Sequence, residues 1–170
     1  QEAIDQINTL LEQPAFADCK VRIMPDVHAG AGCVIGFTAD LGDKVIPNIV
    51  GVDIGCGMLT VNIGKIDIDY DKLDATIRAR VPSGRNVHGD LVPETLIEKA
   101  KELITELHCK GDLHNISWLE HSMGTLGGGN HFIEIDEGSD GSKYLVIHTG
   151  SRNLGKQVAE YYQRLAVKRL

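Results

Sequence analysis

An α+β fold, with small mixed sheets packed against helices, is the class that the sequence predicts. Segments with helical and strand-like hydrophobic spacing are interleaved irregularly, unlike the regular strand–helix alternation of a parallel α/β sheet. Hydrophobic residues make up 42% and charged residues 24% of the 170 residues, as in ordinary globular proteins. Because no repeat, linker or low-complexity tract interrupts the sequence, we expect a single domain over residues 1–170.

The amino-terminal part is predicted to contain a helix over 1–12 and strands over 19–24, 33–38 and 58–63. Apolar residues recur every three or four positions between Ile4 and Leu11, which is the spacing of an amphipathic helix. Apolar and basic side chains alternate from Cys19 to Ile23 within the segment 19–24, which is typical of a strand with one solvent-facing side.

The remaining predicted elements are helices over 70–80, 92–108 and 153–170 and strands over 131–135 and 143–148. The helix over 92–108 has the clearest signals, since Pro93 suits a first turn and Glu94 complements the helix dipole. An acidic turn over 136–142 joins the two strands, whereas residues 116–124 fit neither pattern clearly. The first and last helices lack capping residues, so we expect both ends to be fragment boundaries.

Charge and cysteine content restrict the function. The 17 Lys and Arg against 24 Asp and Glu give a formal charge of -7, which excludes a broadly basic nucleic-acid binder. A local patch would be needed, and among candidates such as Arg85, Arg152 and Lys156 we expect only Arg152 to bind phosphate. The four cysteines lack the paired spacing of a disulfide framework, and no export signal or bilayer-long apolar stretch is visible. We therefore expect a cytoplasmic protein.

Glycine-rich loops are the most informative feature of the sequence. In the loop 51–58, Asp53 and Cys56 lie three positions apart among glycines, so a carboxylate and a thiolate could bind one metal ion or bridge two. The alternative is that Cys56 is a small buried apolar residue.

In the loop 127–132, three consecutive glycines precede Asn130 and His131, and the alternative there is a flexible hairpin with a hydrogen-bonded histidine.

A third loop, residues 148–155, runs from a strand end into a helix start. Free backbone N–H groups at such a junction favour an anion, and Ser151 and Arg152 add a hydroxyl and a guanidinium. The alternative is a capped helix with an exposed arginine.

Together the three loops supply a mixed sulfur, nitrogen and oxygen ligand set: Cys56, His131, His148 and Asp53. From ligand softness alone this set favours zinc. A second group of metal-binding residue types comprises His108, Cys109, His114 and His121. It lacks a matching second pair of closely spaced ligands elsewhere in the sequence, so we expect it not to bind metal.

Four motifs, in this order, resemble those of the RtcB family of RNA-splicing ligases: Met24–His28, Val50–Met58, Gly127–Phe132 and His148–Gly155. The resemblance covers essentially the whole chain but only the amino-terminal part of a family member. It therefore implies an RtcB-like fold that is incomplete at its carboxy-terminal side. Cys56 and His131 are only 75 positions apart, which suggests a short paralogue.

The resemblance implies a ligase that depends on GTP and Mn²⁺ and acts in tRNA splicing or RNA repair. Such an enzyme joins RNA 3′-phosphate or 2′,3′-cyclic phosphate ends to 5′-hydroxyl ends through a guanylated histidine, and an archease-like activator is a further expected partner. By resemblance, Cys56, His131 and His148 bind one manganese ion. Cys56 bridges to a second, which Asp53 also binds, and Zn²⁺ can substitute.

The remaining roles implied by resemblance concern GTP and RNA. Asn130 corresponds to a contact with the guanylate phosphate and Glu134 to a contact with the guanine edge. Arg152 and His28 correspond to ligands of RNA phosphate. We expect the guanylated histidine and one metal-binding histidine to lie beyond Leu170, so that this chain contains no catalytic residue and is inactive alone. The alternatives are a metal- and phosphate-binding module, or a metal-dependent phosphoesterase acting on RNA ends.

Overall fold

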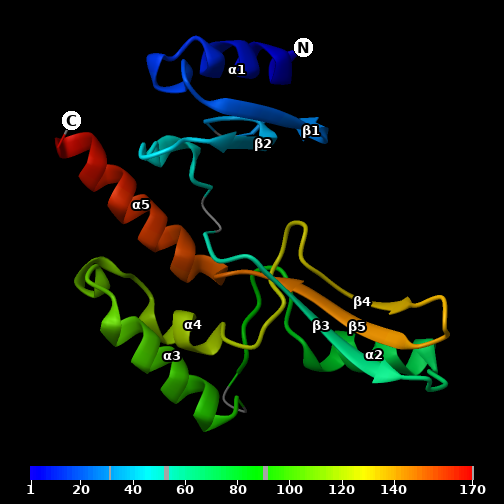
Figure 1. Ribbon diagram of the computed structural model, residues 1–170. Coiled ribbons are helices and arrows are strands. Elements are labelled where there is room, and N and C mark those ends of the chain that lie inside the picture. The colour runs from blue at the N-terminus through cyan, green and yellow to red at the C-terminus, as the bar shows by residue number, and fades with distance from the viewer. Residues whose placement is uncertain (31, 52–53, 90–91, 170) are drawn as a thin grey trace. The chain divides into compact units, whose positions relative to one another are not determined.

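The computed structural model describes residues 1–30, 32–51, 54–89 and 92–169 (Figure 1). This part of the chain contains helices and two small antiparallel sheets. The predicted α+β class is confirmed. The chain divides into two compact units, Gln1–Gly51 with Tyr162–Leu170, and Val52–Tyr161. The single ligase region expected over 1–170 stays a prediction.

The first unit contains α1 (Glu2–Leu11) and a two-stranded sheet of β1 (Lys20–His28) and β2 (Ile35–Asp40). The rings of Phe16 and Phe37 meet edge to face, with their centroids 5.7 Å apart. The strand β1 is longer than predicted, and its pairing register shifts between Ile23 and His28. Pro25 lies inside this irregular stretch, where a residue without an N–H group is tolerated.

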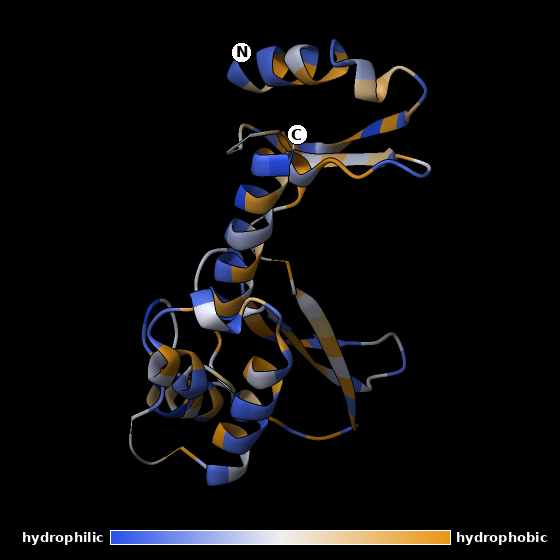
Figure 2. Ribbon diagram, turned by 90° about the vertical axis from the view of Figure 1, so that its left-hand side faces the viewer, coloured by the Kyte–Doolittle hydropathy of each residue, from blue (hydrophilic) through white to orange (hydrophobic). Residues whose placement is uncertain are grey.

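The second unit is built on a sheet with the strand order β3-β5-β4. Its strands are β3 (Gly57–Gly64), β4 (Phe132–Glu137) and β5 (Lys143–Thr149). The helices are α2 (Tyr70–Arg80), α3 (Glu94–Glu106), α4 (Ile116–His121) and the start of α5 (Arg152–Arg169). The ambiguous segment 116–124 therefore begins as a short helix. Hydrophilic and hydrophobic residues alternate along α5, as in an amphipathic helix (Figure 2).

The core of the second unit lies where α3 and α4 meet. Its buried residues are Ile104, Cys109, Leu113 and Leu119. Cys109 is completely buried, as expected for a thiol that acts as a small apolar residue. The neighbouring His121 is held by a 2.7 Å contact between its Nδ1 and the carbonyl oxygen of Ser117. No helix in the described part of the chain is both long and apolar enough to cross a membrane.

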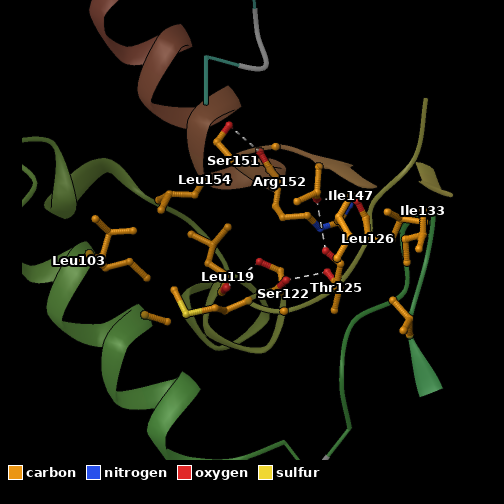
Figure 3. Close-up of a pocket in the computed structure, with 17 residues that line it drawn as sticks. Leu103, Leu119, Ser122, Thr125, Leu126, Ile133, Ile147, Ser151, Arg152 and Leu154 are labelled. Atoms are coloured by element: carbon orange, nitrogen blue, oxygen red, sulfur yellow. Dashed lines mark hydrogen bonds between the residues drawn. The ribbon is translucent and has the colours of Figure 1, made fainter. Parts of the chain in front are cut away.

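An apolar cavity of about 460 Å³ separates these helices from the sheet. Leu103, Leu119 and Leu154 line it from the helices, and Ile133 and Ile147 line it from the sheet (Figure 3). Ile133 and Ile147 are paired across β4 and β5. Because successive side chains of a strand point to opposite faces, the next pair along these strands, Phe132 and His148, faces away from the cavity.

The core can be tested with the substitution Leu119→Ala. Leu119 is 3% exposed, so the free energy of unfolding should fall by about 2–5 kcal/mol, through lost burial and the cavity left behind. Leu59→Ala is the matched control, because Leu59 is 56% exposed. Urea unfolding followed by circular dichroism measures both changes. Equal losses in the two variants would contradict the placement of the core.

Candidate functional site

The candidate site lies at one end of the three-stranded sheet, where β3 and β4 begin and β5 ends. The pairing register aligns Met58, His148 and Phe132 in one row across the three strands. Cys56 immediately precedes β3, and His131 immediately precedes β4. Antiparallel pairing with the central strand therefore brings Cys56 and His131 to either side of His148.

The three side chains meet closely enough to share one ion. Cys56 Sγ is 3.7 Å from His131 Nε2, and one potential ligand atom from each of the three residues lies within 4.8 Å of the others. The two imidazole rings have centroids 5.3 Å apart and are inclined by 77°. Ligands at 2.0–2.3 Å from a tetrahedral metal are themselves about 3.5 Å apart, so only a small closure is needed. Cys56 is exposed and both histidines are half-buried.

Gly127 makes the close approach of two site residues possible. Its φ of +90° is a backbone conformation that side chains rarely adopt. A Cβ atom there would lie 2.6 Å from His131 Nδ1 and would overlap the guanidinium of Arg152. The Gly127 carbonyl accepts a 2.7 Å hydrogen bond from the N–H of Gly84, which ties the glycine loop to the segment after α2.

Arg152, the first residue of α5, points its guanidinium toward the same loops. Its Nη2 donates to the carbonyl oxygens of Gly84 at 3.1 Å and Asn86 at 3.4 Å. Its Cζ lies 5.8 Å from the centre of the Trp118 ring. The φ of Arg152 is +52°, a left-handed conformation that costs a non-glycine residue about 1–2 kcal/mol. The surrounding contacts therefore hold Arg152 in a strained backbone position.

A cationic pocket of about 520 Å³ adjoins the Cys/His group. Its lining residues are Gly84, Arg85, Trp118, Gly128, His131, Arg152, Asn153 and Lys156. Three cations thus face one cavity in a chain of formal charge -7. Arg85 and Lys156 had no signal in the sequence that separated them from solvated surface residues. The contact of Gly84 with Gly127, which brings Arg85 to the pocket, exists only in the folded chain.

The other predicted site residues have different outcomes. Asn130, next to His131, is exposed, and Glu134 is exposed on the face of β4 that also carries Phe132. His28 belongs to the first unit, where its Nδ1 is 3.0 Å from the carbonyl oxygen of Ala29. Asp53 lies outside the described residues. The ligand roles of these four residues stay predictions.

The residues gathered at this sheet end are of the types that bind divalent cations and phosphate groups. The family described as tRNA-splicing ligase RtcB matches residues 6–170, and the chain belongs to that family. It is 32% identical over 168 residues to an RNA-splicing ligase RtcB1 of Escherichia coli, covering 88% of this chain and 40% of the relative. It is 30% identical over 205 residues to a tRNA-splicing ligase RtcB of Archaeoglobus fulgidus, covering 93% of this chain and 42% of the relative.

The chain spans about two fifths of the length of these curated relatives. The alignment with the Archaeoglobus protein extends over 205 positions, although this chain has only 170 residues. The relative therefore has residues within the matched region that this chain lacks, in keeping with the short spacing between Cys56 and His131.

The role of Gly127 can be tested with Gly127→Ala, using Gly129→Ala as a matched control. Both glycines have positive φ, but a Cβ at Gly129 would meet nothing within 4 Å. The added methyl group at 127 should displace His131 and lower the affinity for a divalent ion, probed with Mn²⁺, by about tenfold or more, a loss comparable to that of disturbing a ligand's supporting contacts. The electron paramagnetic resonance signal of free Mn²⁺ measures this. Equal affinities in the two variants would contradict the proposed crowding.

Proposed function

We propose that this chain forms the part of an RNA ligase site that binds a divalent cation and the phosphate of an RNA end. The reaction served is the GTP-dependent joining of 3′-phosphate or 2′,3′-cyclic phosphate ends to 5′-hydroxyl ends. The observation that carries the proposal is the convergence of Cys56, His131 and His148 beside a pocket lined by three cations. Membership of the RtcB family supports the same chemistry.

The donor set fits a divalent transition metal. One sulfur and two nitrogen atoms, from residues at three strand ends, can approach a single ion without rearrangement of the sheet. By ligand preference alone the set suits Zn²⁺, since Mn²⁺ favours oxygen ligands. The family supports Mn²⁺ as the functional ion, so we propose that Zn²⁺ binds to the same residues and inhibits. A bound divalent ion would neutralise charge on a transferring phosphoryl group.

The chain's own side chains would orient the reacting ends. Arg152, already held by two carbonyl groups, presents its guanidinium at the pocket, where it can pair with a phosphate. Asn130 would contact the phosphate of the guanylate and Glu134 the guanine edge. Asp53 would share a second metal ion with Cys56, and His28 would add a contact to RNA phosphate.

A second candidate function is hydrolysis of phosphate esters at RNA ends, because a metal ion beside a cationic pocket also suits that reaction. We expect the chain, incubated with Mn²⁺, GTP and an RNA that ends in a 2′,3′-cyclic phosphate, neither to hydrolyse the ring nor to become guanylated. Guanylation should be absent because none of His88, His108, His114 and His121 lies in a motif that resembles that of the guanylated histidine. Gel analysis of labelled RNA and labelled GTP measures both events. Ring opening without GTP would favour the phosphoesterase, and a labelled protein would place the guanylated histidine within this chain.

The metal site itself can be tested with Cys56→Ser, using Cys33→Ser as a matched control. Burial raises the pKa of the Cys33 thiol, so it stays protonated and should not bind metal near neutral pH. The wild-type chain and Cys33→Ser should bind Co²⁺ with a thiolate-to-cobalt absorption band in the near ultraviolet. Cys56→Ser should lose that band and at least about tenfold in affinity, since even outer contacts of metal ligands contribute 10–100-fold. An unchanged band in Cys56→Ser would refute the site.

A further inference from the structure

We propose that Trp118 and Arg152 form a platform on which a nucleobase of the bound RNA end stacks. The inference rests on the proposed function, because it takes RNA to be the ligand of the cationic pocket. It assigns a role to Trp118, a residue of α4 that sequence patterns do not separate from a core residue.

The volume of the pocket is the first argument. At about 520 Å³, it lies within the 300–1,000 Å³ range of small-molecule sites and is much larger than a phosphate group requires. Its lining combines the cations Arg85, Arg152 and Lys156 with the indole of Trp118. Cationic grooves that contain an exposed aromatic face are the usual means of binding single-stranded nucleic acid, in which bases stack and phosphates pair with Lys or Arg.

The position of Trp118 is the second argument. The indole is half-buried and packs against the core cluster of the second unit, while also forming part of the pocket wall. The core contacts fix the ring, so little conformational entropy would be lost when a base stacks on the pair of Trp118 and Arg152. A freely rotating surface ring would lack this advantage.

The contact with Arg152 is the third argument. The guanidinium lies over the indole, with Cζ 5.8 Å from the ring centre, and two carbonyl groups hold its Nη2. Both an indole face and a guanidinium plane stack on bases. A base can therefore stack on the outer face of the guanidinium, with the indole fixed behind it, and Arg85 and Lys156 flank this position for phosphate. Stacking of this kind tolerates any base, and purines, with their larger rings, should bind more tightly.

The single tryptophan of this chain allows a direct test. Titration with adenosine 3′-phosphate should quench the fluorescence of Trp118 in a saturable manner. Ribose 5-phosphate and inorganic phosphate should bind at least about tenfold more weakly and quench little, because base stacking supplies the missing affinity. Equal affinity for all three probes would overturn the platform and leave a phosphate site only.

Variants give an independent test by equilibrium dialysis with labelled adenosine 3′-phosphate. Trp118→Leu should weaken binding by about tenfold or more, and Trp118→Phe by less, because phenylalanine retains an aromatic face. In both Trp118 variants the affinity for inorganic phosphate should change by no more than about fivefold. This is the contribution expected from the contact between the aromatic ring and the Arg152 guanidinium. The control is Tyr70→Leu, which removes an aromatic ring that is 52% exposed and does not line the pocket.

Circular dichroism checks that each variant is folded. If Trp118→Leu does not fold, Trp118→Phe still decides the test. Unchanged nucleotide affinity in a folded Trp118 variant would overturn the inference. Titration with Co²⁺ in the same samples separates the two proposals. If a Trp118 variant loses nucleotide binding but still binds Co²⁺, the substitution has affected the platform alone. If the wild-type chain does not bind Co²⁺, the metal site of the proposed function is refuted.

Discussion

The candidate site depends on one constraint, the antiparallel register of β3 and β4 against the central strand β5. That register aligns Met58 and Phe132 with His148, and so brings the preceding residues, Cys56 and His131, to the same end of the sheet. Because side chains alternate between the faces of a strand, a slip of one residue would turn His148 toward the apolar cavity. The apolar side chains that face the cavity from the sheet, which include Ile133 and Ile147, oppose such a slip. The apolar pattern of the strands thus fixes the geometry of the polar residues at this end of the sheet.

The loops around this sheet end are arranged for close approach. Gly127 leaves room for His131 and for the guanidinium of Arg152, and Arg152 itself adopts a left-handed backbone conformation. Strained conformations persist where surrounding contacts over-determine them, and they concentrate at functional sites. The same contacts place three cations around one pocket of an otherwise acidic chain. Local geometry, rather than net charge, therefore determines where a phosphate could bind.

Sequence patterns predicted the order and type of the long elements well, because periodicity reports which face of an element is buried. They were weaker at α4, which is too short to show a period, and at β1, where Pro25 lies within an irregular strand. The residue types of Cys56, His131 and His148 identified them as candidate ligands, but their meeting depends on strand register. Nothing in the sequence separated Arg85 or Trp118 from ordinary surface and core residues, because their role arises from contacts between distant loops.

The candidate metal site requires that one thiolate and two imidazoles bind the same ion. X-ray absorption at the zinc edge of the Zn²⁺-loaded chain tests it most directly, since sulfur and nitrogen neighbours are resolved by distance. A site built from Cys56, His131 and His148 should give one sulfur at about 2.3 Å and two imidazole nitrogens at about 2.0–2.1 Å, with an oxygen or nitrogen atom in the remaining position. A spectrum without sulfur, or with more than one, would contradict it.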